Sequence, residues 1–288
     1  MRDTILFGDC RETLKEFDEK ARMCVTSPPY YGLRNYGDEE YQIGLEQTPE
    51  DYIEQLVNVF KEVKNVLTDD GTCWVNVGDS YYNYRPGRGQ GLVKQTVSNN
   101  KQDLPDVCPR RGNRLKGLKE KDLIGIPWMF AFAMRSDGWY LRQDIIWNKP
   151  NPMPESVRDR CTKAHEYIFL FSKNQNYYFD VDAIKEPTRR KRSVWNIQKK
   201  PYKGAHFAVY PPDLIEPCIK AGSEKGDIVL DPFMGSGTTA MVAKSLGRDY
   251  NGCELHEDYG NLIQKRVKEY HPVEEVSQET SINILDIV

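Results

Sequence analysis

The sequence predicts a single α/β domain built on a mostly parallel sheet with helices on both faces. Short apolar runs typical of strands alternate with amphipathic helical segments along most of the 288 residues, which is the pattern of βαβ units. A glycine-rich turn follows one late apolar run, as expected where a strand passes into a helix beside a ligand. The hydrophobic content of 39% and charged content of 29% favour a globular chain over a disordered or membrane-embedded one.

Seven apolar runs are expected to form the strands. They are Ile5–Phe7, Met23–Thr26, Cys73–Val77, Leu141–Trp147, Tyr167–Phe171, Ile228–Leu230 and Tyr250–Cys253. Helices are expected over Pro49–Leu67, Ile124–Arg135, Thr238 to about Leu246, and Tyr259–Tyr270. In the first of these, apolar residues recur at spacings of three and four, which buries one helix face.

Two aperiodic stretches carry an excess of basic charge. Residues 85–121 hold ten Lys and Arg against three Asp and Glu, and residues 185–203 hold eight against one. Because the formal net charge of the chain is only −3, these segments stand out from an acidic remainder and predict surfaces that face a polyanion. The alternative is that both are solvated loops. Residues 80–123 are expected to form one long basic loop inserted in the domain.

The sequence argues against several classes of protein. No apolar stretch approaches 18 residues, so no transmembrane helix and no membrane partner are expected, and the N-terminus lacks a secretory apolar region. The seven cysteines include no CxxC pair, which argues against a disulfide framework or a zinc site. We therefore expect reduced thiols, no bound metal and a cytoplasmic location.

The sharpest motif is I-V-L-D-P-F-M-G-S-G-T-T at residues 228–239. Gly235 and Gly237 let the backbone turn closely around a ligand before the helix that begins near Thr238. Glu254 ends the next strand, where nucleoside-binding folds place a carboxylate for ribose hydroxyls. No Lys follows the glycines and the third glycine of G-x-G-x-x-G is absent, so a nucleoside without phosphates is the expected ligand. The alternative is a plain strand–turn–helix corner.

A second motif, T-S-P-P-Y at residues 26–30, comes after a strand-like run. Its prolines fix φ and remove two backbone donors, so the motif ends the strand and holds the next residues of the chain at a set angle. The PPxY pattern read by WW domains is the alternative, but it requires an exposed, disordered segment.

Together these motifs resemble the amino-group DNA methyltransferases that use S-adenosylmethionine, in the motif order of the circularly permuted β group. The similarity includes G-D-C at 8–10, W-N-K-P-N-P-M-P-E-S at 147–156, H-E-Y-I-F-L-F-S-K at 165–173 and H-F-A-V-Y-P at 206–211. It implies a Rossmann-like class I methyltransferase fold with a seven-stranded sheet over residues 1–288, in a prokaryotic or phage-encoded protein.

The resemblance also implies a cofactor site. Glu254 would bind the ribose, Asp9 would accept from the adenine amino group, and Cys10 would lie beside it. The methionine part would be enclosed by Phe233, Gly235, Ser236, Gly237 and Thr238 on one side and by His206, Phe207 and Ala208 on the other. Thr26 and Asp231 complete the expected set of cofactor-binding residues. Two alternatives remain, a helix N-cap for Asp9 and core packing for Cys10.

A base inside a duplex has to be flipped out before its amino group can react. The resemblance implies that Tyr30 supplies a flat face for that base, while the Ser27 hydroxyl and the Pro28 carbonyl accept from the amino hydrogens. Pro28 and Pro29 would hold these acceptors still. No covalent cysteine adduct is implied. Glu166 is expected only to orient a strand end.

Ser27 is similar to the N4-cytosine members, whereas N6-adenine members more often carry Asp there. Cytosine N4 is therefore favoured, and adenine N6 is the alternative. Double-stranded DNA is the expected partner, and a homodimer and a cognate restriction endonuclease stay open. DNA contacts are expected from the insertion and from a target-recognition segment at 174–205, through Arg110, Arg111, Arg114, Arg189, Arg190, Lys191 and Arg192.

Two other classes of protein compete with this interpretation. A nucleotide-dependent oxidoreductase would leave T-S-P-P-Y unexplained. A non-catalytic DNA-binding module would not need the glycine-rich turn.

Overall fold

In the computed structural model, residues 1–32, 41–82, 115, 117–199 and 210–269 are described, and this part of the chain forms an eight-stranded sheet in the order β1-β8-β7-β2-β3-β5-β4-β6. The strands are β1 Thr4–Phe7, β2 Ala21–Thr26, β3 Leu67–Val77, β4 Tyr140–Asn148, β5 His165–Ser172, β6 Val194–Asn196, β7 Ile228–Asp231 and β8 Asp249–Glu254. Only β5 runs antiparallel to its neighbours, β3 and β4. All seven expected strands are confirmed.

The eighth strand, β6, lies inside the basic segment at 185–203 and was not expected. It has three residues and pairs in parallel with the edge of β4. Trp195 is its one buried side chain, so a pattern of apolar alternation has too few positions to be recognised.

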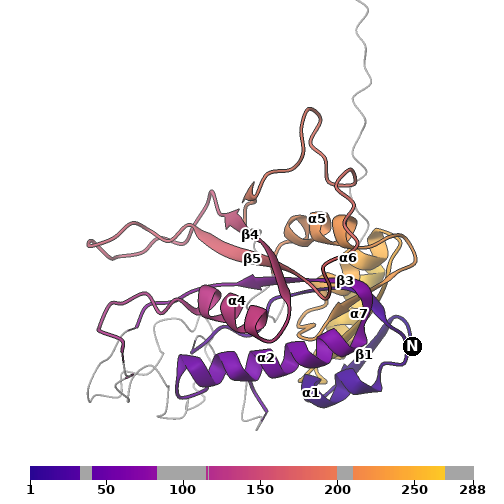
Figure 1. Cartoon of the computed structure of the whole chain (residues 1–288), viewed down its shortest axis with the longest axis horizontal. Helices are drawn as coiled ribbons and strands as arrows, with labels where there is room; N and C mark the ends of the chain where they lie inside the picture. The colour runs from indigo at the N-terminus through magenta and orange to yellow at the C-terminus, as the bar shows by residue number, and fades with distance from the viewer. Residues whose placement is uncertain (33–40, 83–114, 116, 200–209, 270–288) are drawn as a thin grey trace, which may run out of the picture.

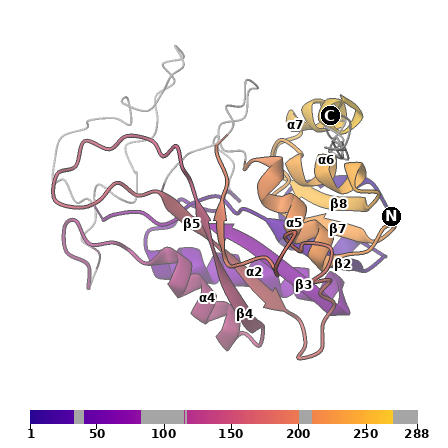
Figure 2. The same cartoon turned by 90° about the horizontal axis from the view of Figure 1, so that it is seen from above.

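Helices cover both faces of the sheet, as predicted (Figures 1 and 2). They are α1 Cys10–Thr13, the 3₁₀ helix η1 Leu14–Glu16, α2 Pro49–Val66, α4 Ile126–Ser136, α5 Pro212–Gly222, α6 Thr238–Ser245 and α7 Tyr259–Glu269. Figure 1 places α2 and α4 on one side of the sheet and α5 on the other. The four helices expected from periodicity are confirmed to within a few residues.

The central strands are apolar on both faces and so build two cores. Cys24 on β2 packs with α1, α2 and α4, while the next residue, Val25, packs with α5 and α6. Cys73 and Trp74 on β3 divide in the same way, because successive side chains of a strand point to opposite faces.

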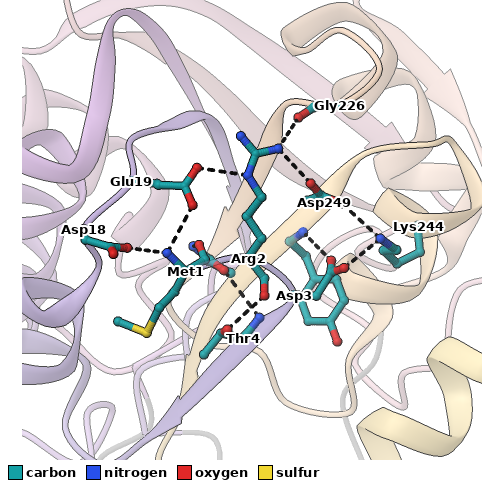
Figure 3. A network of polar contacts seen from close by, with 11 residues as sticks. Met1, Arg2, Asp3, Thr4, Asp18, Glu19, Gly226, Lys244 and Asp249 are labelled. Atoms are coloured by element: carbon teal, nitrogen blue, oxygen red, sulfur yellow. Dashed lines mark hydrogen bonds and ion pairs between the residues drawn. The ribbon is translucent and has the colours of Figure 1, made fainter.

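The first strand of the chain lies beside the last one. β1 pairs in parallel with β8, with Thr4 opposite Asn251, and a polar network reinforces this edge (Figure 3). Arg2 donates to Glu19 at 2.9 Å and to Asp249 at 2.9 Å. Lys244 bridges Asp249 at 3.0 Å and Asp3 at 2.8 Å. Segments from both ends of the sequence therefore meet in one edge of the sheet.

The sheet brings the two sequence motifs to one edge. Because β1, β2, β3, β4, β7 and β8 all run in the same direction, the residues after their carboxyl ends gather there. These residues include Asp9, Ser27, Lys149, Phe233 and Glu254. In open α/β sheets this edge is the usual place for a ligand.

Candidate active site at the carboxyl edge of the sheet

The glycine-rich turn between β7 and α6 is held against α7. Gly235 and Gly237 have φ angles of 53° and 80°, which favour glycine. A Cβ on Gly237 would lie 2.6 Å from Cγ2 of Ile263 in α7, so no larger residue fits without displacing that helix. Arg266 of α7 donates to the Ser236 carbonyl at 2.8 Å and to the Thr238 hydroxyl at 3.1 Å. The turn is thus fixed in shape.

Glu254 lies directly behind this turn. Its Oε2 accepts from the Gly235 amide at 2.7 Å and its Oε1 accepts from the His256 amide at 3.1 Å. The side chain is only 7% exposed, and this burial raises its pKa to about 7. A nearly dehydrated carboxylate beside a glycine turn is a suitable acceptor for ribose hydroxyls, so these residues fit a nucleoside cofactor.

Asp231 joins the two sequence motifs. Its buried carboxylate accepts from the Thr26 hydroxyl at 2.5 Å, from the Phe233 amide at 3.0 Å and from the Tyr210 hydroxyl at 3.2 Å, and it also bonds Thr239. Burial raises the pKa of Asp231 despite these donors. Thr26 ends the strand before Ser27, so this bond fixes the distance between the T-S-P-P-Y loop and the glycine turn. The bond positions both side chains relative to each other, and their contact with the cofactor stays a prediction.

Asp9 carries several bonds before any ligand arrives. It is the N-cap of α1 and accepts from the Arg11 amide at 2.9 Å, and it forms an ion pair with the Arg11 side chain at 2.7 Å. The N-cap alternative is therefore confirmed, and the adenine contact stays a prediction. Cys10 is buried in the core on the α2 side of the sheet, and burial raises its pKa well above the usual range.

The T-S-P-P-Y loop presents Tyr30 in a fixed position. Its hydroxyl donates to Glu166 at 2.8 Å and lies 3.1 Å from the side-chain oxygen of Asn76, which shares the same proton. Its ring lies so close to Gly78 that an added Cβ there would be 2.5 Å from Cε2 of the ring. Tyr52 of α2 donates to the Pro29 carbonyl at 2.7 Å, which ties the loop to the helix below.

Behind Tyr30 lies a buried ion pair that the sequence motifs did not predict. Lys149 is 6% exposed, contacts Glu166 through its ammonium group, and lies 4.3 Å from the centre of the Trp147 ring. Burial lowers the pKa of Lys149. Burial also acts to raise the pKa of Glu166, but the Lys149 charge and the hydrogen bonds outweigh it, so this pKa lies below its usual range. Glu166 thus stays ionised and anchors Tyr30.

The signal for this pair was present in W-N-K-P and H-E-Y-I. Trp147 lies opposite Glu166 in the antiparallel ladder of β4 and β5, so Lys149 and Glu166 meet at the mouth of one strand pair. The strand pairing, which local sequence does not specify, brings them together.

The predicted DNA-contacting residues divide into two sets. Arg110, Arg111 and Arg114 lie outside the described residues, as do most of the 80–123 insertion and residues 200–205. His206, Phe207 and Ala208, which are predicted for the methionine part of the cofactor, also lie outside them. Arg189, Arg190 and Arg192 are exposed before β6. Lys191 lies 5.0 Å from the centre of the Trp195 ring, and Arg189 pairs with Glu186 at 2.5 Å. The four basic side chains at 189–192 therefore come directly before β6, the outermost strand on this side of the sheet.

Across the described ranges, no helix is long and apolar enough to cross a membrane. In the same ranges, no group of three or more His, Cys, Asp or Glu side chains could hold a metal ion.

A glycine turn backed by a carboxylate and a fixed aromatic loop at the carboxyl edge of the sheet define an α/β protein of the nucleoside-binding class. Comparison with known proteins makes the assignment specific. A family model described as DNA methylase, of the N6 and N4 type, matches residues 21–265, and the chain belongs to this family.

Two curated relatives are similar along nearly their whole length. The chain is 48% identical over 275 residues to the Type II methyltransferase M.XycI of Xanthomonas campestris pv. cyanopsidis, covering 93% of this chain and 89% of that protein. It is 49% identical over 271 residues to the Type II methyltransferase M.SmaI of Serratia marcescens, covering 91% and 90%.

Solved structures share the fold. The PvuII DNA methyltransferase (cytosine-N4-specific) superposes with a TM-score of 0.66 at 21% identity, over 91% of this chain and 85% of that one. The M1.HpyAVI–SAM complex superposes with a TM-score of 0.59 at 20% identity, over 92% and 98%. The Rossmann-like methyltransferase fold expected from the resemblance is thereby confirmed, with eight strands in place of seven.

Proposed function

We propose that this DNA methylase transfers the methyl group of S-adenosylmethionine to N4 of a flipped-out cytosine in double-stranded DNA. The observation that carries the proposal is the Tyr30 ring, which Glu166 and Asn76 fix beside the strand end that bears Ser27. A hydroxyl at position 27, where N6-adenine enzymes more often carry Asp, supports cytosine as the target.

The residues for the cofactor come from the other half of the site. Phe233, the turn from Gly235 to Thr238, and Glu254 would hold S-adenosylmethionine, with Asp9 and Cys10 on the adenine side. His206, Phe207 and Ala208 are proposed for the methionine side. Bound there, the cofactor supplies a methyl group on a positively charged sulfur, which is electrophilic.

The chain's own groups act on the substrate nitrogen. The exocyclic nitrogen is a weak nucleophile because its lone pair is delocalised into the ring. The Ser27 hydroxyl and the Pro28 carbonyl accept from its two hydrogens and so favour a pyramidal nitrogen, while the Tyr30 ring packs on the base. On accepting the methyl group that the bound cofactor would supply, the nitrogen would become cationic, and its extra proton would then leave to water.

We further propose that the basic residues at 189–192, together with Arg110, Arg111 and Arg114, bind the phosphate backbone and help to read the target site. Measuring DNA affinity at increasing salt concentration would test the phosphate contacts. Each such contact steepens the fall of log K for DNA binding with log salt concentration. A homodimer and a partner endonuclease are compatible with this arrangement.

The decisive experiment is incubation with mixed-sequence duplex DNA and cofactor labelled in its methyl group, followed by nucleoside mass spectrometry. Labelled N4-methylcytosine is the expected product. Labelled N6-methyladenine would overturn the choice of base, and an absence of label in DNA would overturn the proposal. Tyr30→Ala should lose turnover and keep cofactor affinity, whereas Gly235→Val should lose cofactor binding. Equal binding by both variants would contradict the division into two half-sites.

A further inference from the structure

The connection between β4 and β5, residues 149–164, begins in the candidate active site and then leaves the sheet. Its first residue, Lys149, contacts Glu166, and Glu166 holds the Tyr30 hydroxyl. Figures 1 and 2 show this β4–β5 loop running outward beyond the ends of its two strands. The loop therefore starts beside the proposed base pocket and projects from the edge where DNA would lie.

Met153 lies in the first half of the β4–β5 loop, with its side chain in solvent. It is 71% exposed, the highest value among the large exposed hydrophobic side chains of the described residues. Pro150, Pro152 and Pro154 alternate with it and its neighbours, and each proline fixes φ. A stiff segment thus presents one apolar side chain outward instead of letting it fold back onto the protein.

Contacts on both sides of Met153 brace the loop. Before it, Asn151 exchanges two hydrogen bonds with the backbone of Lys199, at 3.2 Å and 3.1 Å. After it, Glu155 accepts from Arg160 at 2.6 Å and from the Lys163 amide at 3.1 Å.

The far side of the loop is tied to neighbouring segments as well. Arg160 lies 3.8 Å from the centre of the Tyr81 ring, and Asp159 pairs with Lys121 at 2.7 Å. Lys163 donates to the Asp79 carbonyl at 2.7 Å. The exposed methionine is consequently held in place relative to the sheet edge, and the bond to Lys199 links it to the basic segment at 185–203.

A flipped base leaves a gap in the stack, and proteins that distort DNA commonly insert an apolar side chain such as methionine between base steps. On these grounds we propose that the β4–β5 loop enters the duplex and that Met153 is the wedge that occupies the space vacated by the target base. The proposal rests on the proposed function, because it needs a duplex substrate whose base is extruded.

The test compares two substrates that contain the site at which the wild-type chain methylates DNA. One is the fully paired duplex, and the other places an abasic position opposite the target base, so that extrusion costs less. Met153→Ala should lower kcat/KM on the paired duplex by about tenfold or more and leave the abasic substrate nearly unchanged. Met153→Leu should restore most of the loss.

Val157→Ala provides the matched control, because Val157 is an exposed apolar residue of the same loop, at 41% exposure. It should leave both substrates unchanged. A fluorescent base analogue at the target position gives a readout without methyl transfer, and its signal on binding should fall in Met153→Ala. An equal effect of Met153→Ala on both substrates, or no effect on either, would overturn the role of Met153 as a wedge and leave the proposed function standing. A wild-type chain that methylates no duplex DNA, so that no target site can be found for these substrates, would overturn the proposed function with it.

Discussion

Gly78→Ala tests whether the position of the Tyr30 ring controls the reaction. Gly78 follows β3, and a methyl group there would lie 2.5 Å from Cε2 and 3.0 Å from Cδ2 of that ring. Carbon atoms in contact normally lie about 3.5–4.0 Å apart, so the ring would have to move by about 1 Å. Its hydroxyl is bonded to Glu166 and Asn76, which resists a simple shift away from the added methyl.

A displacement of about 1 Å in a positioning group can cost about 10²-fold in rate, or about 3 kcal/mol of transition-state stabilisation. We expect that loss in kcat, measured as methyl transfer to duplex DNA at saturating cofactor. The cofactor Kd should stay near the wild-type value, because the glycine turn and Glu254 lie on the other half-site. A kcat within about twofold of wild type would refute the role given to the ring, because the predicted ~10²-fold loss would be absent.

Gly226→Ala is the control that separates this effect from a general loss of stability. Its φ is 86° and an added methyl would meet nothing within 4 Å, so the substitution strains the backbone without touching the site. It should lower the free energy of unfolding by about 1 kcal/mol with kcat unchanged.

Three further changes address the cofactor turn and the buried ion pair. Burial holds the pKa of Glu254 at about 7, and ribose hydroxyls donate best to the ionised carboxylate, so below pH 7 the cofactor can bind only with release of a proton. Titration calorimetry should therefore show cofactor affinity rising with pH, by up to about tenfold per pH unit, and levelling above about pH 7. An affinity that does not change with pH would contradict this. Gly237→Ala would place a methyl 2.6 Å from Ile263 at a φ of 80°, so cofactor affinity should fall by about tenfold or more while Gly226→Ala binds normally. Glu166→Gln leaves the Lys149 ammonium buried without a carboxylate and should cost about 3–5 kcal/mol of stability in urea denaturation. Adding Lys149→Met should restore part of the lost free energy of unfolding, because no buried charge is then left unpaired. A double variant no more stable than Glu166→Gln would argue against a buried ion pair between Lys149 and Glu166.

Most of the sheet could be predicted because its strands are short, apolar and separated by clear helical periodicity. β3 was the partial exception, since Asp69, Asp70 and Gly71 are typical of a turn, yet the strand already begins at Leu67. β6 was missed because Trp195 is its single buried residue. In both places pairing with a neighbouring strand overrides the local preference of the sequence.

In the candidate site, too, the local motifs could be predicted from the sequence and the long-range contacts could not. The glycine turn and T-S-P-P-Y are local motifs and could be read directly. The bond from Thr26 to Asp231 joins residues 205 positions apart, and the ion pair behind Tyr30 depends on the register of an antiparallel ladder. Neither contact can be derived from local sequence, because the residues that meet lie far apart along the chain. The family resemblance implies a cofactor contact for Thr26 and Asp231 but not the bond between them.

The pairing of β1 with β8 has a consequence for synthesis of the chain. Thr4 lies near Asn251, 247 positions later, so at about 5–20 residues per second a ribosome needs roughly 12–50 s to make the partner of the first strand. During that time β1 is an unpaired edge, a state prone to misassociation, and the charged residues Arg2 and Asp3 beside it oppose such contacts. The glycine turn and Glu254 are also made long after the T-S-P-P-Y loop, so a nascent chain lacks these parts of the site until Glu254 has been synthesised.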